Sequence, residues 1–170
     1  MNLLKPNMYY HSIYTVPYES LKKRGIKCVL FDLDNTCVGY HEKKPTKELK
    51  KLFDNLNHLG IKVVIFSNTT PKRIEPFQEL PVLCHPLYRK PFKGNFIKIL
   101  REFHLKKENV CIIGDQLFTD VLGGNRIGIK TCLVEPLSPY DFIGTKLFRF
   151  LEKRIKKHLK LEIGDMDDKV

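Results

Sequence analysis

Short apolar runs and segments with helical periodicity alternate along the chain. The apolar runs are rich in Val, Ile, Leu and Phe and are not broken by a polar residue at every second position, which is typical of strands covered on both faces. Buried strands separated by helices indicate a parallel sheet with right-handed crossovers. The pattern therefore predicts a Rossmann-like α/β fold, with helices flanking a central parallel sheet. We expect its strands at residues 27–32, 61–66, 81–84, 110–114 and 129–134.

The segments between these strands have the spacing of amphipathic helices. The first places Leu49, Phe53 and Leu56 on one face, begins near Pro45 and stops before Gly60. In parallel sheets of this kind, ligands bind at the carboxyl ends of the strands, close to the point where the strand order reverses. The loops after the strands are therefore where we expect the chemistry. Further helices are expected after Pro71 and at residues 91–103 and 119–126.

The first expected strand ends in two aspartates, Asp32 and Asp34, followed by Thr36. Alternation along an extended strand end points both carboxylates the same way, at the same edge of the sheet. Two carboxylates side by side repel each other unless a cation or a shared proton compensates them. A divalent metal ion is the natural partner for this pair.

Polar side chains also follow two of the later strands. Ser67 and Asn68 come after the second strand, and Asp115 follows the fourth, with Asp120 five residues further on. Between these two groups, Lys90 precedes an expected helix. The chain thus carries an ordered set of two aspartates with a threonine, a serine, a lysine and a second pair of aspartates.

This ordered set resembles the four motifs of the haloacid dehalogenase (HAD) superfamily phosphotransferases, and the matching span covers residues 27–134. The resemblance implies that Asp32 attacks phosphorus and that Asp34 protonates the leaving oxygen and then deprotonates the hydrolytic water. It also implies a Mg²⁺ ion held by the carboxylate of Asp32, the backbone carbonyl of Asp34 and the carboxylate of Asp115.

The remaining motif residues receive supporting roles from the same resemblance. Ser67, Asn68 and Lys90 are expected at the phosphoryl oxygens, and Thr36 is expected to orient the first loop beside them. Asp120 is expected to hold Lys90 or a water molecule on the metal. In this superfamily an acid two positions after the nucleophile marks phosphatases and mutases, so Asp34 favours a phosphate-ester hydrolase.

The spacing between the motifs leaves no room for a cap domain. A loop, a helix and a strand account for residues 37–66, and the segment 68–89 is also too short for a further domain. The chain therefore resembles the capless subfamily IIIA, in which the site is open to large substrates. The opening LLKPN element together with DLDNT and GDQLFTD resembles the YqeG-type proteins and the phosphatidylglycerophosphate phosphatases, which makes phosphatidylglycerophosphate the leading substrate.

We expect four segments: an N-terminal segment specific to this subfamily at 1–26, the capless core at 27–142, a basic amphipathic helix at 143–161 and an acidic tail at 162–170. The helix carries seven Lys or Arg residues against Glu152 alone. Such a helix fits an anionic membrane, with its apolar face among the acyl chains and its lysines among the headgroups. Closure of the core or a subunit interface explains the same pattern, and the oligomeric state stays open.

Thirty basic residues against 19 acidic ones give a net charge of +11, which implies an anionic partner or substrate. A phosphorylated ligand, an anionic membrane surface and nucleic acid all satisfy this requirement. Two alternatives to a lipid phosphatase therefore stay open. One is a phosphatase acting on a sugar phosphate, a nucleotide or a phosphoprotein, and the other is an RNA- or ribosome-binding module on the same fold.

The cysteines and the N-terminus indicate a reducing, cytoplasmic compartment. The five cysteines form no CxxC pair, which argues against a complete disulfide framework or a thiolate zinc site, and Cys37 is interpreted as a packing residue. Lys5 and Pro6 interrupt the N-terminal stretch before an apolar segment develops, unlike a secretory signal. We expect a cytoplasmic protein, and peripheral binding to the inner face of the membrane stays open. His41 and His85 are expected on loops beside the site.

Overall fold

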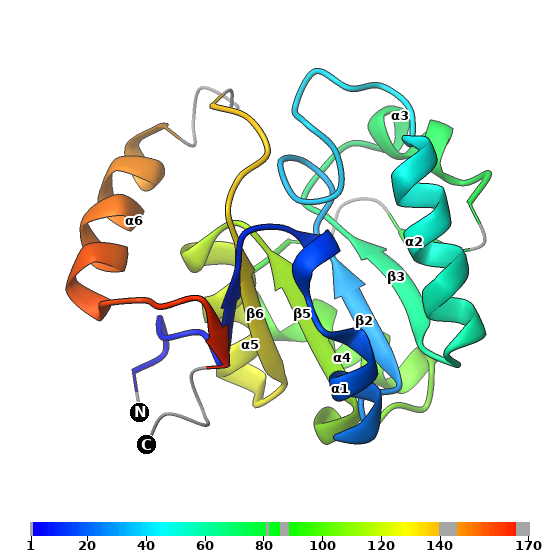
Figure 1. Ribbon diagram of the computed structural model, residues 1–170, viewed down its shortest axis with the longest axis horizontal. Helices are drawn as coiled ribbons and strands as arrows, with labels where there is room; N and C mark the ends of the chain where they lie inside the picture. Colours follow the sequence, from blue (N-terminus) through cyan, green and yellow to red (C-terminus); the bar gives the residue numbers. More distant parts are fainter. Residues whose placement is uncertain (1, 81, 86–88, 140–145, 166–170) are drawn as a thin grey trace.

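The computed structural model describes residues 2–80, 82–85, 89–139 and 146–165. Seven strands form one sheet in the order β4-β3-β2-β5-β6-β1-β7 (Figure 1). All the pairings are parallel except that between β1 and β7. The strands are β1 (Met8–Tyr10), β2 (Cys28–Phe31), β3 (Lys62–Phe66), β4 (Leu83–His85), β5 (Val110–Gly114), β6 (Lys130–Val134) and β7 (Gly164–Asp165).

Helices connect these strands and cover both faces of the sheet (Figure 1). The α-helices are α1 (Tyr18–Lys23), α2 (Lys47–His58), α3 (Pro71–Ile74), α4 (Lys93–Glu102), α5 (Leu122–Ile127) and α6 (Lys146–Leu159). The other helical turns are η1 (Ile13–Thr15), η2 (Glu75–Phe77), η3 (Lys107–Asn109) and the π-helical η4 (Leu117–Val121). This arrangement confirms the predicted α/β fold.

The central strand β2 shows why the fold forms a three-layer structure. Val29 and Phe31 belong to the apolar cluster shared with α1 and α2, whereas Leu30 belongs to the cluster shared with α4 and α5. All four residues of β2 are buried, because successive side chains point to opposite covered faces. Each helix layer thus packs on one face, and the ends of the central strands are positioned by two cores.

The chain termini contribute two strands that the apolar pattern does not reveal. β1 pairs in parallel with β6, and β7 pairs antiparallel with β1 at the sheet edge. Three and two residues are too few to show a periodicity, and the burial along them is partial. Residues 2–26 therefore add a strand to the sheet and a helix to one of its faces.

The predicted elements shift slightly in the structure. β4 spans Leu83–His85 rather than 81–84, and the helix predicted at 119–126 begins as the π-helical turn η4 and continues as α5. Among the described residues, no helix combines the length and the apolar character needed to cross a bilayer. Between β2 and β3 the chain forms a loop and α2, and no cap domain interrupts the described part of the core.

Candidate active site

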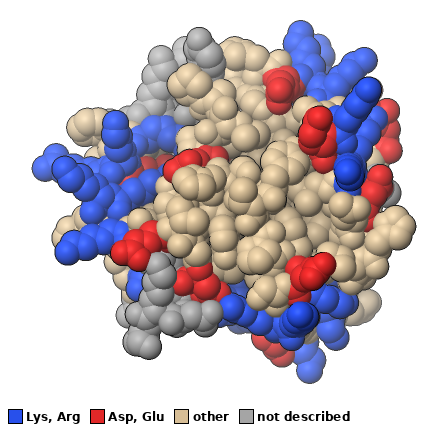
Figure 2. All heavy atoms as spheres, in the orientation of Figure 1, with Lys and Arg blue, Asp and Glu red and all other residues tan. Residues whose placement is uncertain are grey.

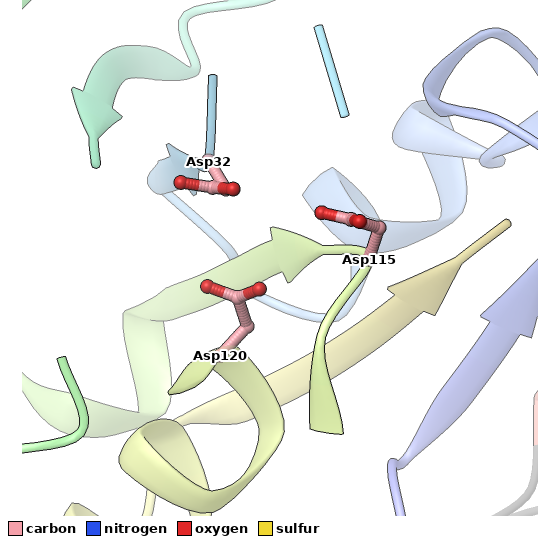
Figure 3. Close-up of side chains that lie close together, drawn as sticks. All are labelled: Asp32, Asp115 and Asp120. Carbon is pink, nitrogen blue, oxygen red and sulfur yellow. The ribbon is translucent and has the colours of Figure 1, made fainter. Parts of the chain in front are cut away.

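The sheet order reverses between β2 and β5, and three aspartates meet at the carboxyl ends of these two strands. Asp32 follows β2, Asp115 follows β5, and Asp120 lies on η4. Figure 3 shows the three carboxylates turned toward one another. One oxygen of each lies within 4.8 Å of the others, and all three side chains are buried. This is the place where ligands bind in open α/β sheets.

Gly114 leaves room for the side chain of Asp120 to turn back toward Asp115. A side chain at this position would place its Cβ 2.2 Å from the carboxyl carbon of Asp120, a distance that atoms do not tolerate. The carboxylate of Asp120 turns back and accepts a hydrogen bond from the amide of Gln116 at 3.2 Å. Glycine therefore brings Asp120 into the cluster, five residues beyond Asp115 in the sequence.

Lys90 lies between two of the aspartates and offsets part of their charge. Its ammonium group donates to Asp32 at 2.7 Å and to Asp120 at 2.6 Å, and its side chain is only 1% exposed. Burial alone would lower the pKa of Lys90, but the two carboxylates outweigh that effect and raise it. Burial also raises the pKa of Asp120 to about 7, against the opposing effect of Lys90. Lys90 is thus a buried, charged counter-ion of the cluster.

Asn68 positions Lys90 through its backbone. The side-chain oxygen of Asn68 accepts a bond from the amide of Lys90 at 2.7 Å, and its NH₂ group donates to the carbonyl of Lys90 at 3.0 Å. The prediction placed Asn68 at the phosphoryl oxygens, but both ends of its amide are engaged with Lys90. Ser67 is buried at the end of β3, at the same edge of the sheet.

Thr36 connects the first motif to the last. Its hydroxyl donates to an oxygen of Asp115 at 2.8 Å, so the loop after β2 is fixed to the end of β5. Burial raises the pKa of Asp115, and the opposing influences come from Arg149 and Thr36. The sequence suggests that Thr36 orients its own loop, and the structure adds that it does so by binding Asp115.

Asp34 has an arginine partner that the sequence analysis missed. Arg73, on α3, donates to one carboxylate oxygen of Asp34 through Nε at 2.9 Å and Nη2 at 2.8 Å, and also to the carbonyl of Glu42. Burial raises the pKa of Asp34, while Arg73 acts in the opposite direction. The signal was weak, because Arg73 is one of many basic residues and follows no motif.

Arg149, on α6, is a second cation that the motifs do not reveal. Its guanidinium binds both the carboxylate and, at 3.0 Å, the backbone carbonyl of Asp115. Glu152, one turn further on, is 2% exposed, pairs with Arg149 at 3.5 Å and accepts the amide of Phe118 at 3.1 Å. Arg149 and Glu152 of α6 therefore face the site, whereas Phe148 and Phe150 are exposed.

The charges of the site do not cancel among the described residues. Four carboxylates, those of Asp32, Asp34, Asp115 and Asp120, face three cations, Lys90, Arg73 and Arg149. Hard oxygen ligands with a negative surplus are the donor set that Mg²⁺ prefers. The residues present thus fit a divalent cation at Asp32 and Asp115.

Among the described side chains, two other candidates take no part in the acidic cluster. Cys37 is buried in the core, where burial holds the pKa of its thiol well above the usual range, so it is a packing residue. His41 makes an edge contact with Tyr40 and lines a pocket of about 430 Å³ beside the first motif loop. The side chain of His85 lies outside the described residues.

An α/β sheet with buried aspartates at its central strand ends, a paired lysine and no cap defines a HAD-type hydrolase. The HAD-hydrolase-like family model matches residues 87–136. The fold is also that of the cobalt-bound deoxy-D-mannose-octulosonate 8-phosphate phosphatase of Haemophilus influenzae, at a TM-score of 0.51 and 15% identity over 82% of this chain and 92% of that one. A haloacid dehalogenase-like hydrolase of Brucella suis aligns with a TM-score of 0.52 at 9% identity, over 72% and 93% of the two chains.

Sequence relatives narrow the class. The chain is 40% identical over 157 residues to the Probable phosphatase YqeG of Bacillus subtilis, covering 91% of each protein. It therefore belongs to the YqeG family of HAD-type phosphatases. It is 29% identical to the mitochondrial phosphatidylglycerophosphatase GEP4 of Saccharomyces cerevisiae, over 75% of this chain and 79% of that one. It is 27% identical to phosphatidylglycerophosphate phosphatase 1 of Arabidopsis thaliana, over 95% of this chain and half of that protein.

Proposed function

We propose that this phosphatase hydrolyses phosphatidylglycerophosphate to phosphatidylglycerol, with Mg²⁺ and through a phosphoenzyme on Asp32. The observation that carries the chemistry is the cluster of Asp32, Asp115 and Asp120, whose oxygens approach within 4.8 Å beside Lys90. The substrate is suggested by the two relatives named for phosphatidylglycerophosphate. The geometry of the site thus supports the reaction, and the relatives support the choice of substrate.

Asp32, the backbone carbonyl of Asp34 and Asp115 would hold the metal ion. When bound, Mg²⁺ neutralises charge on the phosphoryl oxygens and lets a carboxylate approach phosphorus. Thr36 holds one oxygen of Asp115 at 2.8 Å, which fixes the plane of that carboxylate. The hydroxyl of Thr36 thus fixes Asp115 to the first motif loop.

Asp32 is the proposed nucleophile. One of its oxygens attacks phosphorus, the ester bond breaks, and the electron pair of that bond leaves with the oxygen of the substrate alcohol. Lys90 binds one oxygen of Asp32 at 2.7 Å, so the carboxylate is held in one orientation at the end of β2. Ser67 and Lys90 are proposed to bind the phosphoryl oxygens, with Asn68 acting through the backbone of Lys90.

Asp34 is proposed to handle the proton in both half-reactions. Its pKa is raised by burial, which favours a protonated carboxyl group able to donate to the leaving oxygen. The resulting carboxylate then takes a proton from water. That water attacks the phosphorus of the aspartyl-phosphate, releases inorganic phosphate and regenerates Asp32. Arg73 holds the carboxyl group of Asp34 in place through two donors.

The proposed lipid substrate also requires access to a membrane surface. The exposed side of α6 combines apolar and basic residues: Phe148 is 51% and Phe150 is 65% exposed, and Lys153, Arg154 and Lys157 are exposed. Figure 2 shows blue side chains gathered along the left edge of the molecule, over α6. This combination supports peripheral contact with an anionic bilayer, which would bring a capless site to a lipid headgroup.

A substrate panel tests the proposal. Purified enzyme with Mg²⁺ is assayed for phosphate release from phosphatidylglycerophosphate in mixed vesicles and from sugar phosphates, nucleotides, a phosphopeptide and an aryl phosphate. We expect the lipid to have the highest kcat/KM, with activity lost on verified metal removal and restored by Mg²⁺. A higher kcat/KM for a water-soluble substrate would overturn the substrate assignment, and full activity without metal would overturn the metal assignment.

A further inference from the structure

Arg149 occupies the side of the cluster where a metal ion is expected. Its guanidinium binds the carboxylate and the backbone carbonyl of Asp115, and Asp115 is fully buried. Arg149 comes from α6, which contributes no motif residue, whereas the three aspartates of the cluster follow β2 and β5 or lie on η4. A cation from outside the core therefore holds a carboxylate that the proposed metal ion needs.

Electrostatics makes the two cations competitors. A monovalent and a divalent cation held by the same carboxylate repel each other strongly, even at the effective dielectric of a protein site. Asp115 already accepts the hydroxyl of Thr36 on one oxygen and Arg149 on the other. A metal ion held by Asp115 would thus meet both an engaged carboxylate and an unfavourable neighbouring charge.

We infer that Arg149 is an internal substitute for the metal ion, so that docking of α6 and binding of metal at Asp115 oppose each other. The inference rests on the proposed metal site. Because coupling between two binding events is reciprocal, metal binding weakens the docking of α6 by the same factor by which docked α6 weakens metal affinity.

The contacts of α6 suit a helix that leaves its position. Polar bonds run from Arg149 to Asp115 and from the amide of Phe118 to Glu152. Two apolar contacts accompany them: Phe148 meets the ring of Phe118, and Ile155 packs on the small apolar cluster of η4 and β6. Its large apolar side chains Phe148 and Phe150 are more than half exposed. Release of the helix therefore breaks the bonds of Arg149 and Glu152 and the apolar contacts of Phe148 and Ile155.

A pair of matched arginines on α6 provides the test. In Arg149→Gln the competing charge is removed, and Arg149→Lys keeps it. Arg154→Gln makes the same charge change at an exposed position of the same helix. Calorimetry gives the Mg²⁺ affinity of each full-length protein, and hydrogen exchange of the α6 amides is followed in the wild type with and without Mg²⁺.

We expect Arg149→Gln to bind Mg²⁺ at least about tenfold more tightly than the wild type, from the repulsion removed. Arg154→Gln and Arg149→Lys should stay within about threefold of the wild type, and Mg²⁺ should speed exchange in α6 of the wild type. Equal affinities in Arg149→Gln and Arg154→Gln, or exchange in α6 that is unchanged or slowed by Mg²⁺, would overturn the inference.

The same measurements separate this inference from the metal proposal. Asp32→Asn serves as the variant that lacks a proposed metal ligand. If no protein in the series binds Mg²⁺, both the metal site and the proposed competition are refuted. If the wild type binds Mg²⁺ and Asp32→Asn does not, the site stands, and the comparison of Arg149→Gln with Arg154→Gln decides on the competition. The exchange measurement on the wild type decides even if a variant folds poorly.

Discussion

Lys90 and Arg149 both bind the acidic cluster, but one is a buried loop residue and the other lies on a surface helix. Lys90 comes from the loop before α4, is 1% exposed, and binds Asp32 and Asp120. Arg149 comes from α6, has a side chain 18% exposed, and binds Asp115. The first is built into the core, with its backbone clamped by Asn68. Arg149 instead reaches the cluster from α6, a helix at the surface whose Phe148 and Phe150 are exposed.

The difference teaches that one cluster can contain a permanent and a replaceable charge. Removing Lys90 would leave two buried carboxylates facing each other, and burial makes that arrangement costly. Removing Arg149 would leave Asp115 the hydroxyl of Thr36 and Glu152 the amide of Phe118 as partners, and Asp115 would keep a place for a metal ion. The comparison therefore predicts a fixed side and an exchangeable side of the same site.

The largest expected effect concerns the carboxylate that Lys90 holds. Asp32→Asn should lower turnover by more than about a thousandfold, because the amide has nearly the same shape but forms no phosphoenzyme. Phosphate release from an aryl phosphate measures the loss, and thermal unfolding checks that the variant is folded. Turnover within tenfold of the wild type in a folded variant would remove Asp32 from the nucleophile role.

The comparison itself is tested by neutralising each cation. Lys90→Met should lower the free energy of unfolding by about 3–5 kcal/mol, because buried Asp32 and Asp120 lose their common partner. Arg149→Gln should cost about 1–2 kcal/mol, since glutamine still donates a hydrogen bond. Urea unfolding without added metal gives both values, and equal losses would contradict the distinction between fixed and replaceable charge.

The next largest effect is expected on membrane binding by the exposed side of α6. Replacing Lys153, Arg154 and Lys157 by Glu should weaken binding to anionic vesicles by more than about a hundredfold, at about 1 kcal/mol for each basic residue lost near the surface. Hydrolysis of an aryl phosphate should stay near the wild-type rate, because these residues lie away from the cluster. Vesicle sedimentation measures the binding, and unchanged binding would refute the membrane surface.

The smallest effect concerns the glycine behind the fixed side. Gly114→Ala should destabilise the fold by about 2 kcal/mol, because the new Cβ would lie 2.2 Å from the carboxyl carbon of Asp120. Gly94→Ala is the matched control, since a Cβ there meets nothing within 4 Å and alanine favours a helix such as α4. Unfolding experiments should show a loss for the first and none for the second.

The sequence predicts the fixed side far better than the replaceable one. Asp32 follows a strand and Lys90 precedes a helix, so the parallel topology determines that they meet. Arg149 and Arg73 reach the site only through the docking of whole helices, which depends on contacts such as that of Glu152 with the amide of Phe118. Periodicity leaves the apolar face of α6 open between a membrane, the core and a subunit interface, and it gives no sign that Glu152 is buried and turned toward the site with Arg149.

The short strand β7 limits how far α6 can travel. It follows the helix after only the residues 160–163, and Asp165 of β7 is paired with Arg24 at the end of α1. Four residues span at most about 14 Å, so the last turn of the helix stays close to the sheet edge wherever its first turn goes. A helix tethered in this way returns at a high effective concentration, without a search through solution. Its exchange with the site is therefore a unimolecular step, whose rate does not depend on the concentration of the enzyme.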